Sequence, residues 1–270
     1  MKRTLFAAAL AGTMMLAAVT SASAQDDMVD PVQESVDSVM LDCCCCDQSR
    51  IYFGAEATFM KFFDSGGVED FGGDDGRFDW EASPRFTLGW EGCDGLGTRV
   101  RYWKWDHTTL SVDDDPISVD TYTIDLEVYQ RLEVGSCTNI EIMGGIRYNE
   151  FIMDRSALPT DRFRGFGGLI GIQADRQLTC NWSAYGRLRE VILADDFFAL
   201  EFGNSNENDG IRDVTEIALG VEYNNCNWSF HAGYEWHLWS NYTRGTIANA
   251  DLETSDIGFA GFVVGGELSY

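Results

Sequence analysis

The sequence has few prolines, few basic residues and, after its first two dozen residues, no long apolar run. Its 270 residues include four prolines, and 19 lysines and arginines stand against 44 aspartates and glutamates, a formal net charge of −25. This excess of acid excludes nucleic acid as a natural partner, because the phosphate backbone is itself negative. Without a later run of about 20 apolar residues, the chain has no candidate for a membrane-spanning helix beyond its start.

The first 24 residues have the three parts of a secretory signal peptide. Lys2 and Arg3 form a positive start, residues 5–19 an apolar core, and residues 22–24 a small-residue cleavage site. A membrane anchor is the alternative, but the apolar core is short for a span of about 20 residues. We therefore expect export and a mature chain that begins at Gln25. Without Lys2 and Arg3 it has 17 basic against 44 acidic residues, a net charge of −27.

The eight cysteines fall into two groups, one contiguous and one spaced by 44, 43 and 46 residues: Cys43, Cys44, Cys45 and Cys46, then Cys93, Cys137, Cys180 and Cys226. In an exported protein, an even number of cysteines favours disulfides. A metal site is disfavoured for the contiguous group, because zinc sites space their ligands by two or more residues.

From residue 50 onward, apolar and polar residues alternate with period two, which is the pattern of β-strands. In WSFHAGYEWHL, Trp228, Tyr234 and Trp236 share one face, and His231 and Glu235 share the other. A high content of aromatics (13%) and glycine (28 residues) agrees with a chain of many strands. Ten such segments are predicted, at residues 50–63, 80–91, 97–109, 118–134, 139–153, 163–178, 182–194, 212–223, 228–240 and 256–270.

The connections between these segments alternate in length. Those that hold the four spaced cysteines have about four to six residues, whereas others, such as DSGGVEDFGGDDGR, are long and acidic. Short turns at one end and long loops at the other, with an even number of strands, are typical of transmembrane β-barrels. A soluble sandwich is the alternative. It is disfavoured because the polar face carries glycine among its charges and the apolar face has tryptophans toward its ends, as in interfacial girdles.

We therefore predict an all-β protein, a transmembrane antiparallel up-and-down β-barrel of about ten strands over residues 50–270. Its short turns are expected in the periplasm, together with the acidic, cysteine-rich segment 25–49, which is expected to be a disordered linker or a short helix. The last segment, FVVGGELSY, is similar to the C-terminal signal of outer-membrane barrels in Gly265, Leu268 and Tyr270, while Val263 departs from it. The expected location is the outer membrane of a Gram-negative-type bacterium, with lipid and the barrel-assembly machinery as partners.

Six glycine- and aromatic-rich segments follow one another in the predicted barrel: GLGTRVRYWKWDH (95–107), IEIMGGIRYNEF (140–151), FGGLIGIQADRQL (166–178), WSAYGRLREVIL (182–193), HAGYEWHLWSN (231–241) and GFAGFVVGGELSY (258–270). Together they resemble the Legionella-type major outer-membrane protein family. The resemblance runs from about residue 50 to the C-terminus. It implies an outer-membrane β-barrel that forms a pore, and it implies no catalytic residues.

The polar faces of the predicted strands carry charges of both signs. The expected lumen-lining residues are Arg85, Arg99, Arg101, Arg131, Arg147, Arg187 and Arg189, with Glu56, Glu81, Asp125, Glu127, Glu141, Asp175, Glu216, Glu222 and Glu235. Ten strands give a backbone diameter near ~20 Å, of which inward side chains leave under ~10 Å. Two interpretations stay open: a narrow pore for small solutes or ions with a mild preference for cations, or a closed structural or adhesive barrel filled by salt bridges. Which face of segment 97–109 points to the lumen is also undecided, because Arg99, Trp103 and Trp105 lie on the same face.

An outer-membrane protease is the enzymatic alternative, and it needs paired aspartates and an Asp–His couple at the outer rim. Asp106 and His107 are adjacent, but neighbouring residues of a strand face opposite ways, so we expect no enzyme. The outer loops hold clustered acids: Asp64, Asp70, Asp74, Asp75, Asp113, Asp114 and Asp115. They have no EF-hand spacing, and we expect solvated loops rather than a calcium site, with no metal and no cofactor.

The contiguous cysteines are expected to reach the turns. Successive turns of a barrel are about 12 Å apart, too far for a disulfide, whose Cα atoms lie within about 7 Å. Residues 43–46 span about 10 Å when extended. Our hypothesis is that each of these four cysteines pairs with a different turn and that the segment lies across the periplasmic mouth. Turn cysteines paired with one another, or free thiols, are the alternatives.

Overall fold

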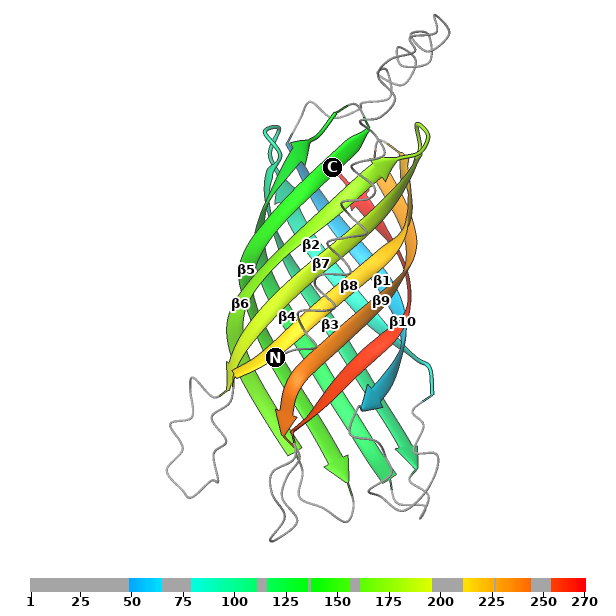
Figure 1. Ribbon diagram of the computed structural model, residues 1–270. Coiled ribbons are helices and arrows are strands. Elements are labelled where there is room, and N and C mark those ends of the chain that lie inside the picture. Colours follow the sequence, from blue (N-terminus) through cyan, green and yellow to red (C-terminus); the bar gives the residue numbers. More distant parts are fainter. Residues whose placement is uncertain are drawn as a thin grey trace, which may run out of the picture. The chain divides into compact units, whose positions relative to one another are not determined.

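The computed structural model describes residues 49–64, 79–110, 116–135, 137–155, 161–195, 211–225, 227–243 and 254–270. These residues form ten strands (Figure 1). The strands are β1 (Arg50–Asp64), β2 (Glu81–Glu91), β3 (Leu96–Leu110), β4 (Pro116–Glu133), β5 (Thr138–Arg155), β6 (Asp161–Gln177), β7 (Trp182–Asp195), β8 (Ile211–Asn225), β9 (Trp228–Thr243) and β10 (Thr254–Ser269). Within the described ranges, no helix is long and apolar enough to cross a membrane.

The ten strands close into one antiparallel barrel. Each strand pairs with its neighbours in sequence, and β1 pairs with β10 to complete the ring. At this seam the backbone N–H of Tyr270 donates to the carbonyl of Ile51 at 2.9 Å, and the N–H of Ile51 donates to Tyr270 at 3.0 Å. Closure leaves no strand at an open edge of the sheet, as a lipid environment requires. The predicted fold is confirmed, with strand ends that differ from the expected ones by at most three residues.

The strand register determines the width of the barrel. Paired residues followed once around the ring lead from Phe62 back to β1 at Arg50, a displacement of 12 residues (62 − 50). For ten strands, this displacement corresponds to a tilt of about 40° and a backbone diameter of about 20 Å. The interior is therefore wide enough for large side chains from opposite walls to meet, and their packing decides whether it is open.

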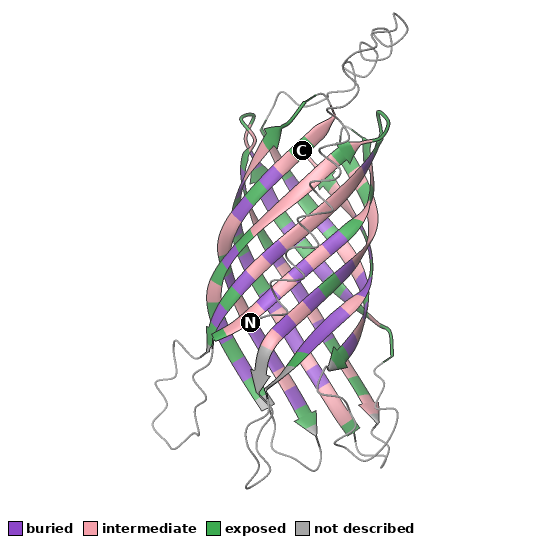
Figure 2. Cartoon of the chain, in the orientation of Figure 1, coloured by how far each residue is buried: buried purple, intermediate pink, exposed green. Residues whose placement is uncertain are grey.

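Side chains alternate between an apolar outer face and the interior, as the exposed and buried positions along each strand in Figure 2 show. On the outer face, aromatic rings gather toward both ends of the strands. Tyr223 contacts Trp182 and Trp228 near the short turns, with ring centroids 5.2 and 5.4 Å apart, and Tyr122 contacts Tyr148 at 5.9 Å toward the loops. An apolar band between aromatic belts is the outer surface of a transmembrane barrel.

Strand β3 settles which way residues 97–109 face. It keeps an unbroken register with β4 from Leu96 to Leu110, and Trp103 and Trp105 are buried, with 2% and 0% of their surface exposed. Arg99 shares their side of the strand and also faces the interior, where it contacts Glu127. The alternation is therefore regular, and the apolar residues of this segment that face inward fill the lumen.

Two interior glycines lie beside tyrosine rings of the neighbouring strand. Gly89 pairs in register with Tyr52, and Gly97 with Tyr129; a Cβ added at either glycine would overlap the ring. The two tyrosine hydroxyls meet at 3.1 Å inside the barrel. Glycine at these positions lets each ring lie flat against the opposite strand, which also fixes the register.

We expect Gly97→Ala to lower the free energy of unfolding by about 1–3 kcal/mol, because the Tyr129 ring must move out of its place. Gly168→Ala is the matched control, since Gly168 is exposed and a Cβ there would meet nothing within 4 Å. Urea unfolding of the refolded barrel in detergent measures both variants. Equal losses in the two would show that the contact with Tyr129 does not matter.

Candidate functional site

The interior of the barrel is the candidate functional site, and its side chains form three levels. The turn-side level, toward the short turns, contains Arg50, Tyr52, Glu91, Arg99, Tyr129, Arg131, Glu141, Asp175, Glu222 and Glu267. The ion-pair layer, in the middle, contains Glu56, Arg85, Arg101, Asp125, Glu127, Arg147, Arg187, Arg189, Glu216 and Glu235. The aromatic layer, toward the long loops, contains Phe62, Trp103, Trp105, Phe151, Trp239 and Phe259.

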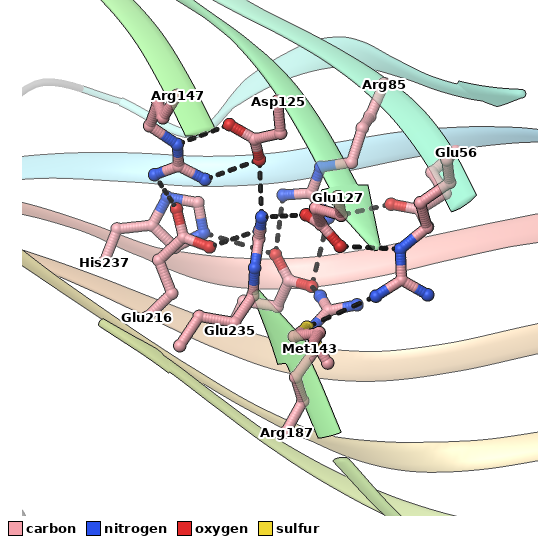
Figure 3. Close-up of polar contacts among 12 residues, drawn as sticks. Glu56, Arg85, Asp125, Glu127, Met143, Arg147, Arg187, Glu216, Glu235 and His237 are labelled. Carbon is pink, nitrogen blue, oxygen red and sulfur yellow. Dashed lines mark hydrogen bonds and ion pairs between the residues drawn. The ribbon is translucent and has the colours of Figure 1, made fainter. Parts of the chain in front are cut away.

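The ion-pair layer joins strands that are not neighbours (Figure 3). Arg189 on β7 contacts Asp125 on β4 at 2.5 Å and Glu216 on β8 at 2.7 Å, and it also pairs with Glu127. Arg147 on β5 donates twice to Asp125, at 2.6 and 2.7 Å, and pairs with Glu216. Since two strands separate β4 from β7, these bonds cross the lumen.

A second group of ion pairs completes the layer. Arg85 on β2 contacts Glu56 on β1 and Glu235 on β9, each at 2.7 Å. Arg187 on β7 contacts the same Glu235 at 2.6 Å, and His237 approaches it at 3.3 Å. Through Glu235 this group joins β2, β7 and β9, which are not neighbours in the barrel.

The centre of the ion-pair layer is shielded from water. Asp125 and Glu127 have no exposed surface, and Arg189 is 1% exposed. A water-filled channel at this level would leave these charged atoms accessible. Buried charges are tolerated only when they are paired and hydrogen-bonded, and the shared arginines provide this pairing. At this level the lumen is closed.

The aromatic layer closes the lumen a second time. Phe259 on β10 lies at its centre, with ring centroids 5.1 Å from Trp105, 5.5 Å from Trp103 and 5.4 Å from Phe62. Trp239 joins it at 5.9 Å. Edge-to-face contacts of this kind stabilise aromatic clusters beyond the burial of their area. The aromatic layer was not predicted from the sequence. The pattern that could have indicated it is that both faces of the strands are apolar in their loop-side halves.

The turn-side level is polar and partly accessible. Arg99 contacts Glu127 at 2.6 Å and Glu141 at 2.9 Å, and Arg131 contacts Glu91 at 3.0 Å. Other acids there, Asp175, Glu222 and Glu267, are partly exposed. Water therefore contacts these three acids, whereas Tyr52 and Tyr129 of the same level are buried and meet each other across the lumen.

The residues expected to line the lumen all project from the inward side of their strands. Glu81, the outermost of them, contacts His107 at 3.0 Å. Asp106 lies on the opposite face and contacts Lys104 at 3.3 Å. The Asp–His couple considered for a protease is therefore not formed between these two residues.

The cysteines are only partly within the described residues. Cys93 lies in the turn between β2 and β3 as an exposed free thiol, so no disulfide is present there. Cys137 and Cys180 lie in the next two turns. Residues 1–48 and Cys226 lie outside the described residues, as do Asp70, Asp74, Asp75, Asp113, Asp114 and Asp115. The free thiol of Cys93 contradicts the hypothesis that all four turn cysteines are paired, and pairing of the contiguous cysteines with the other turns stays a prediction.

Among solved structures, several barrels of other bacteria are similar at low identity. Ail of Yersinia pestis, in complex with the heparin analogue sucrose octasulfate, is 7% identical over 83% of this chain and 99% of its own, with a TM-score of 0.39. The outer membrane protease OmpT of Escherichia coli is 11% identical over 83% and 96%, with a TM-score of 0.44. The translocator domain of the autotransporter NalP from Neisseria meningitidis is 14% identical over 92% and 97%, with a TM-score of 0.41.

Among proteins of curated function, none matches the sequence. A family model does match it: that of the Legionella pneumophila major outer membrane protein precursor, over residues 107–270. The matched range begins within β3 and includes the whole of β4 to β10, more than half of the chain. The chain therefore belongs to the family of the Legionella pneumophila major outer membrane protein precursor, and its barrel is an outer-membrane β-barrel.

Proposed function

We propose that the protein is a narrow outer-membrane pore for small ions or solutes that is closed in the structure and opens when the ion-pair layer rearranges. One observation carries the proposal: the arginines of this layer share their acids. Arg189 contacts three carboxylates, and Asp125 and Glu216 each accept from Arg147 as well. An arginine in such a network can exchange one acid for another without leaving a carboxylate unpaired.

The approach to this layer supports the same proposal. Asp175, Glu222 and Glu267 of the turn-side level are partly exposed, so cations can gather at the turn end of the lumen. Acids outnumber arginines at the turn-side level, which raises the local concentration of cations. A mild preference for cations follows, provided that ions pass the ion-pair layer at all.

A closed structural or adhesive barrel is the second candidate, and the aromatic layer favours it. Trp105 and Phe259 have no exposed surface, and this layer has no charged groups through which an ion can pass. In this case the ion pairs stabilise a permanent wall, and any function belongs to the parts of the barrel outside the membrane.

Single-channel recording of the refolded, oxidised protein in a planar bilayer separates the two candidates. We expect long closed periods with brief, small openings, and a reversal potential in a salt gradient that favours cations. The same recording after reduction tests the predicted disulfides between Cys43–Cys46 and the turns. Openings that lengthen on reduction would show that these disulfides restrict the periplasmic mouth. A complete absence of openings in both states would support the closed barrel.

A further inference from the structure

Arg101 differs from the other arginines of the ion-pair layer. It lies on β3, paired in register with Thr87 on β2 and Asp125 on β4, and is 6% exposed. Its Nε and Nη1 atoms are enclosed and have no hydrogen-bond partner among the described residues. Each of the other four arginines of the layer contacts at least one carboxylate, whereas Arg101 has no ion pair with any described acid.

The acids near Arg101 are already used by other arginines. Asp125 accepts from Arg147 and Arg189, and Glu127 accepts from Arg99 and Arg189. Each of these carboxylates therefore has its oxygens directed at guanidinium groups other than Arg101. An arginine cannot lose its charge inside a protein, so Arg101 stays charged although it has no direct ion pair.

The layer around Arg101 contains charges of both signs. The charges of Arg187 and Arg189 in this layer repel Arg101, and the carboxylates of Glu127 and Glu56 attract it. These three arginines belong to one largely buried layer, where electrostatic interactions are far stronger than in water. Burial of an unpaired charge is costly, which makes an added negative charge favourable here.

We propose that Arg101 binds a small monovalent inorganic anion, of the chloride or bromide class. One unpaired guanidinium needs one negative charge, and a layer this enclosed accommodates a single small ion better than a phosphate ester or a larger oxoanion. The register partner Thr87 brings a hydroxyl group to the same level, as a further donor. The anion pairs with the guanidinium of Arg101 while the layer is in its closed state.

The inference does not depend on conduction, since a permanently closed barrel contains the same unpaired charge. Its first test is the unfolding midpoint of the refolded full-length protein in detergent, with gluconate exchanged for bromide at constant ionic strength. For the wild type we expect a saturable rise of the midpoint with bromide, because an ion that binds only the folded state stabilises it. Arg101→Gln should abolish the rise. The matched control Arg131→Gln, which alters an arginine already paired with Glu91, should retain it.

Two results would overturn the proposal: a wild-type midpoint that is the same in gluconate and bromide, or an Arg101→Gln protein that responds as the wild type does. A second measurement needs no variant. Crystals of the wild type soaked in bromide should give an anomalous peak beside the Arg101 guanidinium. The absence of this peak, or peaks only on the protein surface, would also overturn it.

Discussion

Arg189→Met should lower the free energy of unfolding by about 3–5 kcal/mol, the range expected when one partner of a buried ion pair is removed. Arg189 is 1% exposed and contacts three acids from β4 and β8. Methionine fills part of its volume but leaves those carboxylates with fewer donors in a dry layer. The loss therefore comes mainly from the charges that remain.

Arg131→Met is the matched control. Arg131 also contacts two acids, Glu91 at 3.0 Å and Glu141 at 3.5 Å, but its side chain is 33% exposed. Water can replace its bonds, so we expect a loss of about 0–1 kcal/mol. Urea unfolding in detergent, followed by tryptophan fluorescence, measures both. Similar losses in the two variants would show that the ion-pair layer is as accessible to water as the turn-side level.

The salt dependence of the free energy of unfolding distinguishes buried ion pairs from exposed ones. Exposed pairs weaken as salt rises, because the screening length falls from about 10 Å at 0.1 M to about 3 Å at 1 M. Bonds such as those of Arg147 to Asp125, which has no exposed surface, are screened much less. The difference in stability between the wild type and Arg189→Met should therefore persist at 1 M salt.

The sequence was sufficient to predict the barrel and the direction of its charged residues. Period-two alternation specifies which side chains share a face, and the turn lengths specify the order of the strands. The face of a side chain and the order of the strands are therefore local properties of the sequence. The pairing of Arg189 with Asp125 or of Arg85 with Glu235 is not local. It depends on strand tilt and on the displacement of 12 residues around the ring, which no single segment encodes.

The aromatic layer could not be predicted for a different reason. The rule that apolar residues face lipid and polar residues face the lumen fails where both faces of a strand are apolar. Trp103, Trp105 and Phe259 share strands with lipid-facing residues, and only closure of the barrel shows that they meet one another. The sequence also could not show that Arg101 is unpaired. The charges along a strand do not indicate which acids already accept hydrogen bonds from other arginines.

The double variant Trp105→Ala/Phe259→Ala should give frequent openings in a planar bilayer where the wild type gives rare ones. These two rings have no exposed surface and lie 5.1 Å apart at the centre of the aromatic layer, so their removal opens a passage on the loop side. Large-to-small substitutions of this kind cost about 3–5 kcal/mol each in a packed core. Folding is therefore verified first by the heat-dependent gel mobility of the refolded barrel.

The control removes aromatic rings of similar size from the lipid face. Trp236→Ala/Phe262→Ala changes residues that are 36% and 55% exposed on the outer wall and leaves the lumen intact. We expect it to conduct as the wild type does. Openings in this control would mean that any loss of aromatic packing makes the barrel leak.

The double variant also decides whether the ion-pair layer opens by itself, because the two layers lie in series along the lumen. If Trp105→Ala/Phe259→Ala conducts, the remaining ion pairs must exchange partners spontaneously, and the protein is a pore whose aromatic layer limits opening. If it folds and stays silent, the bonds of Arg147 and Arg189 form a permanent closure. A third variant that adds Arg189→Gln should then conduct, because the arginine that connects β7 with β4 and β8 is lost. If that variant also shows no openings, the interior supports only a structural role for the barrel.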